Sequence, residues 1–600
     1  MTGQPEFLPM TGEEAKLLGI DQFDVVLITG DAYVDHPSFG TALIGRVLQD
    51  AGYSVGVIAQ PDWKNDEDLR RLGEPRLFFS VSAGNVDSLV NAFTPSLKRR
   101  HSDVYSPGGR LLRPDRATLV YTDRVHSLFP KTPIVIGGIE ASLRRFAHYD
   151  YWSDSVRQSI LADAPADLLV FGMGERQVVA IADRLAAGEA AGTLTDIPGT
   201  AYRIEKKVWR SMEHAGYVVL PGYPEVKEDR YAYAKAFAMH YAEQDPLRGR
   251  PVAQPHPKTV IVQNPPAMPL AGDELDRVYE LPYTRRAHPS YTEPIPALEP
   301  VRFSVVTHRG CFGACSFCAL THHQGRIIQS RSADSIVREV ERMARMPEFT
   351  GIVQDVGGPT ANMYGIHCGR WETAGTCPDR RCIDCPALDR SHEEQVRLLR
   401  RLSEIPGVKR VFIASGIRYD LIPPGEDYLA EVCTHHVSGH LKVAPEHVAE
   451  RVCACMGKPP REAFDAFRER FEALQKGKKK RQYLVPYLMS GHPGCRITDM
   501  VELAEYVRDT GLYTEQVQDF TPTPMSISTT IYHTGLDPFT LEEVYVPKGR
   551  EKRVQRALMH YRDPENYALV REGLRAAGRE DLIGNAWRCL VPARRKGRGG

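Results

Sequence analysis

Three cysteines, Cys311, Cys315 and Cys318, lie in one short loop with the spacing C-x3-C-x2-C. Thiolates this close in sequence are soft anionic ligands of the kind that hold an iron–sulfur cluster. A four-iron cluster takes four ligands and this loop supplies three, so one iron would stay open for a small molecule. Gly310 and Gly313 let the loop backbone wrap closely around such a cluster. The alternative interpretation is a zinc knuckle or three unrelated thiols.

A second set of cysteines follows within a short, polar, glycine-bearing segment that contains almost no core-forming residues. Its members are spaced C-x8-C-x4-C-x2-C: Cys368, Cys377, Cys382 and Cys385. A loop of this composition needs a staple to be ordered. Four thiolates complete a tetrahedral zinc site or hold a second iron–sulfur cluster. We favour an auxiliary cluster that binds substrate or relays electrons, with structural zinc as the alternative.

The segments around the first loop predict the fold that must position it. Apolar strand-like runs alternate with amphipathic helical segments, and the cysteine loop follows the first strand. The expected strands cover residues 303–307, 351–356, 410–415, 440–444, 482–489 and 515–520. Six strand–helix units in this order predict a partial (β/α)6 TIM-like barrel. Chemistry is then expected at the carboxyl ends of its strands.

Polar and glycine residues are found at those predicted strand ends. The second strand is followed by Gly357, Gly358, Pro359 and Thr360, and the fourth strand carries Lys442 and Glu446. Three further side chains, Arg418, His492 and Cys495, follow the third and fifth strands and are candidates for substrate contact. For His322 and His323, just after the cysteine loop, we expect a structural role, with a hydrogen bond to the cluster or to SAM as the alternative.

The C-x3-C-x2-C loop after a first barrel strand resembles the radical S-adenosylmethionine (SAM) superfamily. That resemblance implies that the open iron of a [4Fe-4S] cluster chelates the amino and carboxylate groups of SAM. It also implies that an electron from the cluster cleaves SAM to a 5′-deoxyadenosyl radical. Phe317, just before the third cysteine, matches the aromatic residue that packs near the adenine.

The resemblance also implies roles for the strand-end residues. Gly357 and Gly358 match the start of a GGE-type motif whose backbone meets the SAM amino group, but Pro359 replaces the usual acid. A carbonyl or Thr360 must then take over that contact. In the fourth-strand segment, Lys442 is expected to pair with the SAM carboxylate and Glu446 to accept from the ribose hydroxyls. The alternative for these two residues is a surface ion pair.

Residues 1–244 predict a doubly wound α/β domain, because buried strand-like runs alternate with helices. This domain resembles the cobalamin-binding-type domain that often precedes a radical SAM barrel. The cobalamin-ligating D-x-H-x-x-G motif is absent, since the nearest text, Asp35-His36-Pro37-Ser38-Phe39-Gly40, has the wrong spacing. We therefore do not expect bound cobalamin. A relic scaffold or a substrate-recognition domain is the alternative.

The rest of the chain divides by composition. Residues 245–300 form a proline-rich connector with a short helix near 273–279, and residues 301–540 form the barrel with a cysteine-rich insertion at 361–390. Residues 541–600 predict a small C-terminal helical cap that ends in a basic tail.

The whole arrangement resembles the YgiQ-type radical SAM family, on the strength of CFGACSFCALTHHQGRIIQSRS, DVGGPTANMYG and LKVAPEH. This implies a radical SAM enzyme supplied by a flavodoxin- or ferredoxin-like electron donor, and it implies no particular substrate. One alternative is a methyl- or methylthio-transferase that acts on RNA or another macromolecule. Another is a non-catalytic iron–sulfur redox sensor or scaffold.

Composition limits the partners. Lys plus Arg and Asp plus Glu both number 76, so no global field draws the chain to nucleic acid or membrane. The first residues lack the pattern of a signal peptide, and no apolar run is long enough to cross a bilayer. The clustering of the twelve cysteines indicates metal binding in a reducing compartment, so we expect a cytoplasmic protein.

Overall fold

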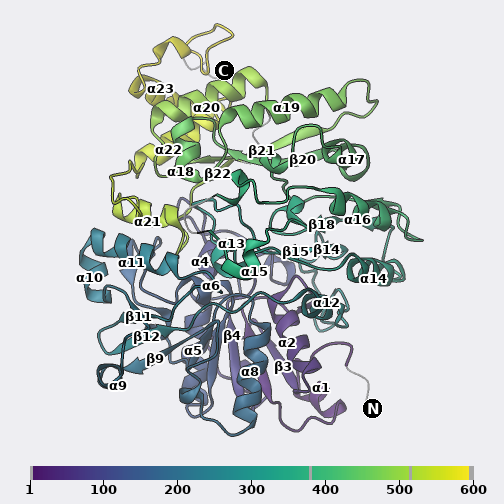
Figure 1. Cartoon of the computed structure of the whole chain (residues 1–600), viewed down its shortest axis with the longest axis vertical. Coiled ribbons are helices and arrows are strands. Elements are labelled where there is room, and N and C mark those ends of the chain that lie inside the picture. The colour runs from purple at the N-terminus through teal and green to yellow at the C-terminus, as the bar shows by residue number, and fades with distance from the viewer. Residues whose placement is uncertain (1–4, 378–380, 513–516, 594–600) are drawn as a thin grey trace, which may run out of the picture.

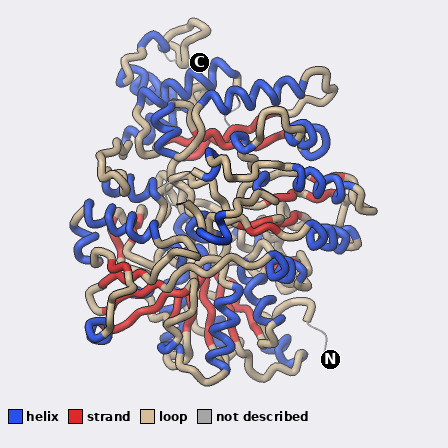
Figure 2. Tube along the Cα trace, viewed as in Figure 1, coloured by secondary structure: helices blue, strands red, loops and turns tan. Residues whose placement is uncertain are grey.

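The computed structural model describes residues 5–377, 381–512 and 517–593. The chain forms an N-terminal α/β unit, purple to blue in Figure 1, on which the teal and green barrel unit is stacked. Figure 2 shows the strands of the N-terminal unit gathered in one sheet and those of the barrel unit in a separate, more open array. Among the described residues, no helix combines the length and the hydropathy that crossing a bilayer requires.

The N-terminal unit is built on a nine-stranded sheet with the order β10-β11-β12-β9-β8-β5-β4-β1-β3. Five of its strands run parallel: β1 (Val25–Thr29), β3 (Val55–Ala59), β4 (Phe78–Ser82), β5 (Ile134–Gly137) and β8 (Leu168–Val170). The chain leaves β1 for β3 on one side and then crosses to β4 on the other. Ligands of open α/β sheets bind at the carboxyl ends of the strands beside such a reversal.

The other end of the sheet differs from expectation. After the antiparallel β9 (Thr200–Glu205), the sheet continues through β12 (Thr259–Gln263) and β11 (Val252–Pro255) to β10 (Val218–Val219). Residues 252–263 of the predicted proline-rich connector are thus interior strands of the N-terminal sheet. The reason is local: the T-V-I-V-Q run of β12 contains no proline and is rich in β-branched residues. The predicted short helix is present as α12 (Gly272–Glu280).

The second unit is the partial barrel that the sequence predicts. Its parallel strands follow chain order: β14 (Ser304–Val306), β18 (Asp355–Gly357), β19 (Arg410–Val411), β20 (His440–Glu446), β21 (Tyr483–Ser490) and β22 (Val517–Asp519). The short β17 (Ile352–Val353) pairs with β19, and a bridge from Ile417 to Val443 links the third strand region to β20. The first two residues of the sixth predicted strand, 515 and 516, lie outside the described residues.

Helices cover the outer side of the barrel strands. They include α14 (Ala333–Ala344), α16 (Glu393–Ser403), α18 (Glu450–Met456), α19 (Arg461–Gln475) and α20 (Ile497–Thr510). On α14, Ile336, Val340 and Met343 are buried on the face toward the barrel. These apolar faces remove the barrel wall from water and so fix the strand ends in place.

The C-terminal segment returns to the N-terminal unit before it forms the cap. Helix α21 (Ile527–Thr534) packs against α11 (Arg230–Ala242), and its His533 ring stacks on Tyr149 of β6 (His148–Asp150), with the ring centres 4.5 Å apart. The predicted helical cap contains α22 (Arg550–Met559) and α23 (Tyr567–Ala576). The predicted basic tail at 594–598 lies outside the described residues.

Candidate functional site

The three loop cysteines lie between β15 (His308–Arg309) and α13 (Leu320–Gln324). The loop is closed by hydrogen bonds from the Cys311 amide to the Gly325 carbonyl, 3.1 Å, and from the Cys318 amide to the Cys315 carbonyl, 3.0 Å. Gly310 has φ +85°, and a Cβ there would stand 2.1 Å from the Ile327 carbonyl oxygen. Only glycine lets the chain enter the loop this close to the neighbouring backbone.

Burial and mutual proximity control the state of these thiols. Burial, and then the neighbouring Cys315, raise the pKa of Cys311. The same causes, with burial again the largest, raise the pKa of Cys318 to about 12. Cys311 and Cys318 are therefore protonated at neutral pH without a metal, and a bound iron–sulfur cluster must displace their protons.

The Arg418 side chain contacts the cysteine loop and does not point into an opening of the barrel. Its Nη1 donates to the Gly313 carbonyl at 3.1 Å and lies 3.7 Å from Cys315 Sγ. Asp420 holds the guanidinium through a buried ion pair of 2.9 Å. This placement supplies positive charge where three thiolates would collect. Substrate contact, the predicted role of Arg418, does not fit a side chain engaged in this way.

The Gly357–Thr360 turn joins the cysteine loop to the first barrel strand. The Gly357 carbonyl accepts from the Thr307 amide at 2.8 Å and from its hydroxyl at 3.2 Å. Thr360 Oγ1 lies 3.7 Å from Cys311 Sγ. The Gly357 carbonyl therefore cannot accept from the SAM amino group without losing these hydrogen bonds to Thr307. Thr360, the other candidate for that contact, lies beside the predicted cluster ligand Cys311.

Glu446 and Phe317 are brought together by a residue that the sequence analysis missed. Lys458, just after α18, places its Nζ 3.6 Å from Glu446 Oε1 and 5.6 Å from the centre of the Phe317 ring. Glu446 has φ +65°, and its Oε2 is buried without a hydrogen-bond partner among the described residues. Burial raises the pKa of this carboxyl group. The half-buried Lys442 makes no such contact in the described structure.

His492 and Cys495, predicted to contact substrate, are instead fully buried. Both nitrogens of the His492 ring are engaged in hydrogen bonds. Nδ1 lies 2.7 Å from the Pro493 carbonyl oxygen, and Nε2 lies 2.7 Å from the Ser528 hydroxyl. Cys495 Sγ lies 3.7 Å from His447 Nε2. This correction has a tertiary cause: α21, which carries Ser528, closes over the end of β21. The Ser528 amide also donates to the Ser316 carbonyl, so this packing supports the cysteine loop.

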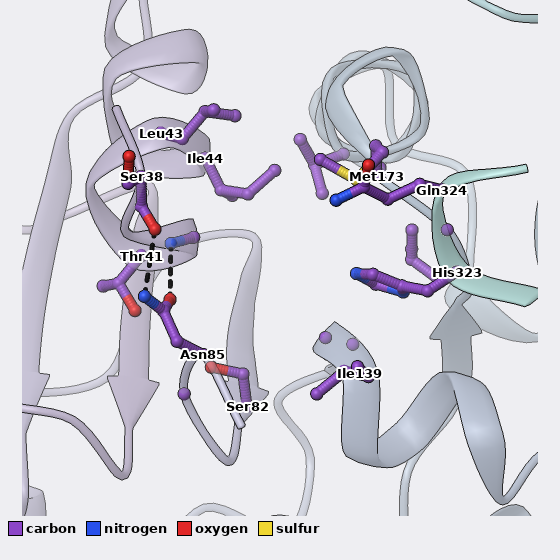
Figure 3. Close-up of a pocket in the computed structure, with 18 of the residues that line it drawn as sticks. Ser38, Thr41, Leu43, Ile44, Ser82, Asn85, Ile139, Met173, His323 and Gln324 are labelled. Carbon is purple, nitrogen blue, oxygen red and sulfur yellow. Dashed lines mark hydrogen bonds between the residues drawn. The ribbon is translucent and has the colours of Figure 1, made fainter. Parts of the chain in front are cut away.

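A cavity of about 480 Å³ lies between the carboxyl edge of the N-terminal sheet and the barrel (Figure 3). On the sheet side it is lined by α2 (Gly40–Asp50) and the turns after β4, β5 and β8. On the barrel side it is lined by β15, α13 and the Gly358-Pro359 turn. The wall residue Pro359 precedes Thr360, the neighbour of Cys311. The cavity thus reaches from the strand-order reversal to the Gly358-Pro359 turn and to Arg309 and Leu320, which flank the predicted cluster loop.

The cavity walls are mostly apolar, with a few placed polar groups. Leu43 and Ile44 lie on one side of the cavity and Ile139 and Met173 on the other (Figure 3), and Ser38, Thr41, Ser82 and Asn85 also line it. Asn85 is fixed, because its Oδ1 accepts from the Gly40 amide and its Nδ2 donates to the Ser38 carbonyl.

Two buried lining side chains of the barrel each carry one nitrogen without a partner in the described structure, His308 Nε2 and Arg309 Nη2. Buried polar atoms are rarely left unpaired.

Two histidines near the cavity form hydrogen bonds with other parts of the protein. His36, in the text closest to the cobalamin motif, is buried, accepts from the Ser38 amide at 3.0 Å and contacts Arg285 Nη1 at 2.9 Å. Neither ring nitrogen is free to ligate cobalt in this arrangement. His323 Nδ1 lies 3.2 Å from Ser142 Oγ of the N-terminal unit, which fits the predicted structural role.

All four members of the second cysteine set line one small cavity, with Trp371 and Leu388 beside them: Cys368, Cys377, Cys382 and Cys385. Two of the four, Cys368 and Cys382, are buried. Residues 378–380, which lie within this insertion, are outside the described residues.

Three family descriptions match the chain. Residues 7–304 match "Radical SAM N-terminal", residues 305–507 match "Radical SAM superfamily", and residues 515–600 match "Domain of unknown function (DUF3362)".

Individual proteins match along nearly the whole length. A UPF0313 protein of Methanosarcina acetivorans is 57% identical, over 98% of this chain and 83% of the relative. A UPF0313 protein of Clostridium botulinum is 50% identical, over 98% and 92%. Among solved structures, the radical SAM methyltransferase TsrM from Kitasatospora setae, with cobalamin and [4Fe-4S] cluster bound, gives a TM-score of 0.49. Its identity is 15%, over 84% of this chain and 74% of that chain.

Proposed function

We propose that this chain, which belongs to the UPF0313 family and carries a radical SAM domain, cleaves SAM reductively to act on a small molecule held in the interdomain cavity. The observation that carries the proposal is the position of that cavity. It runs from the strand-order reversal of the N-terminal sheet to the turn beside Cys311. A substrate there lies next to the loop at which SAM would be bound.

The chain's own residues have distinct tasks in this proposal. Cys311, Cys315 and Cys318 would hold a [4Fe-4S] cluster, which, when bound, supplies the electron for SAM cleavage. Arg418 offsets the negative charge of the thiolates through its contact with Cys315. The free Oε2 of Glu446, near Phe317, is an acceptor suited to the ribose hydroxyls of SAM. The mostly apolar walls of the cavity limit the contact of water with the reactive species.

The shape of the cavity favours a small molecule over a macromolecule. Its volume of about 480 Å³ lies within the range of small-molecule sites. Its apolar walls, with a few fixed polar groups, suit a largely neutral organic compound. The unpaired Arg309 Nη2 and His308 Nε2 would recognise one acceptor group and one further polar group on it.

The central test is product formation. The protein would be loaded anaerobically with iron and sulfide, reduced with dithionite and incubated with SAM. We expect 5′-deoxyadenosine and methionine from the wild type, and none from Cys315→Ala. No 5′-deoxyadenosine from a wild type shown to contain its cluster would contradict the proposal. That result would favour the redox-sensor alternative.

The substrate class is tested with cell extract divided by mass. We expect a fraction of metabolites, freed of RNA and protein, to stimulate 5′-deoxyadenosine formation. Stimulation by the RNA fraction alone, with transfer of labelled methyl groups from SAM to RNA, would favour the alternative methyl- or methylthio-transferase. A nuclease-treated RNA fraction is the matched control.

A further inference from the structure

A second cavity, of about 110 Å³, adjoins the interdomain cavity at the start of α8 (Glu175–Ala186) and is called the side cavity below. Met173, His323 and Gln324 line both cavities and lie on one side of the interdomain cavity in Figure 3. We propose that the side cavity binds a phosphate group. The proposal goes beyond the proposed function, because such binding requires no cleavage of SAM.

The turn before α8 presents a run of free backbone amides to the side cavity. Gly172 has φ +82° and Gly174 has φ +83°, and Gly174 caps the helix without a side-chain hydrogen bond. In the described structure the amides of residues 173–177 donate to no protein group, although Gly174, Glu175 and Gln177 are buried. Buried amides are rarely left unpaired. Successive amides at a glycine-bearing turn and a helix N-terminus form a concavity that holds phosphate oxygens.

Arg309 supplies an independent donor from the barrel unit. Its side chain is 1% exposed, it lines the side cavity, and its Nη2 has no partner among the described residues. Its other nitrogens are engaged, Nη1 in an ion pair with Glu175 and Nε in a hydrogen bond to Tyr279. The ion pair neutralises Glu175, the acidic residue in the wall of the side cavity. Nη2 is left to donate to an anion.

A buried positive charge lies directly behind the wall. The Arg145 guanidinium carbon is 4.5 Å from the centre of the Phe171 ring, which lines the side cavity. Arg145 donates to the neutral Gln263 Oε1 at 2.6 Å and Gln244 Oε1 at 2.7 Å, and it forms no ion pair with a described carboxylate. Burial lowers its pKa to about 9, so the group is charged at neutral pH. An anion in the side cavity would balance this charge.

Two histidines in the wall respond to the same field. Burial, followed by Arg145 and Arg326, lowers the pKa of His322 to about 3. Burial, followed by Arg145 and Arg309, lowers the pKa of His323 to about 4. Both rings are therefore neutral at pH 7. The positive charge of three arginines thus converges on the side cavity.

The volume of the side cavity suits one compact group. About 110 Å³ exceeds the roughly 10–15 Å³ that one water molecule needs, but it is below the range of about 300–1,000 Å³ for complete small-molecule sites. An esterified phosphate keeps three acceptor oxygens, so it can accept from the turn and from Arg309 together. The group is either free inorganic phosphate or the end of a phosphate ester whose remainder lies in the interdomain cavity.

The direct test is equilibrium dialysis of the cluster-loaded protein against radiolabelled inorganic phosphate, without SAM or reductant. We expect saturable binding of about one phosphate per chain, with a Kd at or below about 1 mM. Chloride at equal ionic strength is expected not to displace it. Absence of saturable binding would overturn the proposal, whether or not the same protein cleaves SAM.

Two variants locate the bound phosphate. Gly174→Ala strains the turn, because φ is +83° and a Cβ would stand 3.0 Å from Val170 Cγ1, and Arg326→Gln removes a charge from the wall. We expect each to weaken phosphate binding about tenfold or more. Arg397→Gln, on the exposed face of α16, is the matched control and keeps the wild-type affinity.

Circular dichroism shows whether each variant is folded. Wild-type affinity in both folded variants would place the phosphate elsewhere and overturn the assignment. If Gly174→Ala does not fold, Arg326→Gln decides by the same criterion.

The source of the phosphate group is tested by displacement of the label. Phenyl phosphate is expected to displace it if the site takes a phosphate ester, because the phenyl ring can enter the interdomain cavity through the shared wall. Displacement by unlabelled inorganic phosphate but not by phenyl phosphate would identify free phosphate as the ligand. Both outcomes support the phosphate site and distinguish its two sources.

Discussion

Arg309 of the barrel unit forms a buried ion pair with Glu175 of the N-terminal unit, with Nη1 and Oε1 2.5 Å apart. Glu175 begins α8 (Glu175–Ala186) at the edge of the interdomain cavity, and Arg309 lies two residues before Cys311. The Tyr279 hydroxyl accepts from Arg309 Nε at 3.1 Å. One side chain therefore ties the cavity wall, the connector helix α12 and the entry to the cysteine loop together.

Removing Glu175 leaves a guanidinium buried without its partner. We expect Glu175→Ala to destabilise the fold by about 3–5 kcal/mol. The neighbouring exposed pair of Arg176 with Glu274 is the control, and Glu274→Ala is expected to cost less than about 1 kcal/mol. Urea unfolding followed by circular dichroism measures both. Equal losses from the two variants would contradict the interface role of Arg309.

The cysteine loop leaves no room for a side chain at position 313. A Cβ on Gly313 would stand 2.5 Å from Arg418 Nη1 and 3.3 Å from Cys311 Sγ. We expect Gly313→Ala to lower the iron bound after reconstitution at least several-fold, because overpacking costs about 1–3 kcal/mol where the thiols must converge. Gly216→Ala is the control, since a Cβ there meets nothing. Full iron loading of Gly313→Ala would show that the arginine moves aside freely.

Glu446 offers an unpaired oxygen beside Phe317. If this oxygen accepts from the ribose of SAM, Glu446→Ala removes a charged hydrogen bond worth about 1.5–3 kcal/mol and weakens SAM binding roughly ten- to hundredfold. Equilibrium dialysis with labelled SAM on the cluster-loaded protein measures the change. The exposed Glu450, four residues on, is the control position. Unchanged affinity in Glu446→Ala would remove this residue from the SAM site.

A large side chain at position 41 would occupy the interdomain cavity, because Thr41 lines it. We expect Thr41→Trp to reduce the ratio of metabolite-stimulated to unstimulated 5′-deoxyadenosine toward one, because the indole takes the substrate's place. Thr350→Trp, on an exposed loop, is the control. A ratio for Thr41→Trp equal to that of the wild type would place the substrate elsewhere.

His256 makes the fold sensitive to acid. The ring is buried, both nitrogens lack partners among the described residues, and burial lowers its pKa to about 4. Between about pH 6.5 and pH 4 the unfolded chain binds a proton that the folded chain excludes, so stability falls as pH falls. We expect His256→Phe to lose less stability across this window than the wild type. Urea midpoints at several pH values measure it.

The exposed His101 is the control for that comparison. His101→Gln is expected to follow the pH profile of the wild type. Parallel profiles for His256→Phe and the wild type would show that His256 titrates normally in the folded state.

The sequence predicts features set by local pattern. The strand–helix alternation predicts the barrel, and the cysteine spacing predicts two metal-ligand sets, which stay a prediction. Contacts between distant segments could not be predicted. Lys458 meets Glu446 and Phe317 only because α18 packs on the cysteine loop, and His492 is covered because α21 folds back. Residues 252–263 were missed because surrounding prolines masked a strand that pairs with β9.

The contact of Gly313 with Arg418 also constrains how this loop can change over generations. A larger residue at 313 needs a shorter one at 418, and a shorter residue at 418 forfeits the cation beside Cys315. Each single step passes through an impaired protein, so the two positions are locked as a pair. Selection from a library randomised at both sites should return glycine with arginine together, and rarely either one alone.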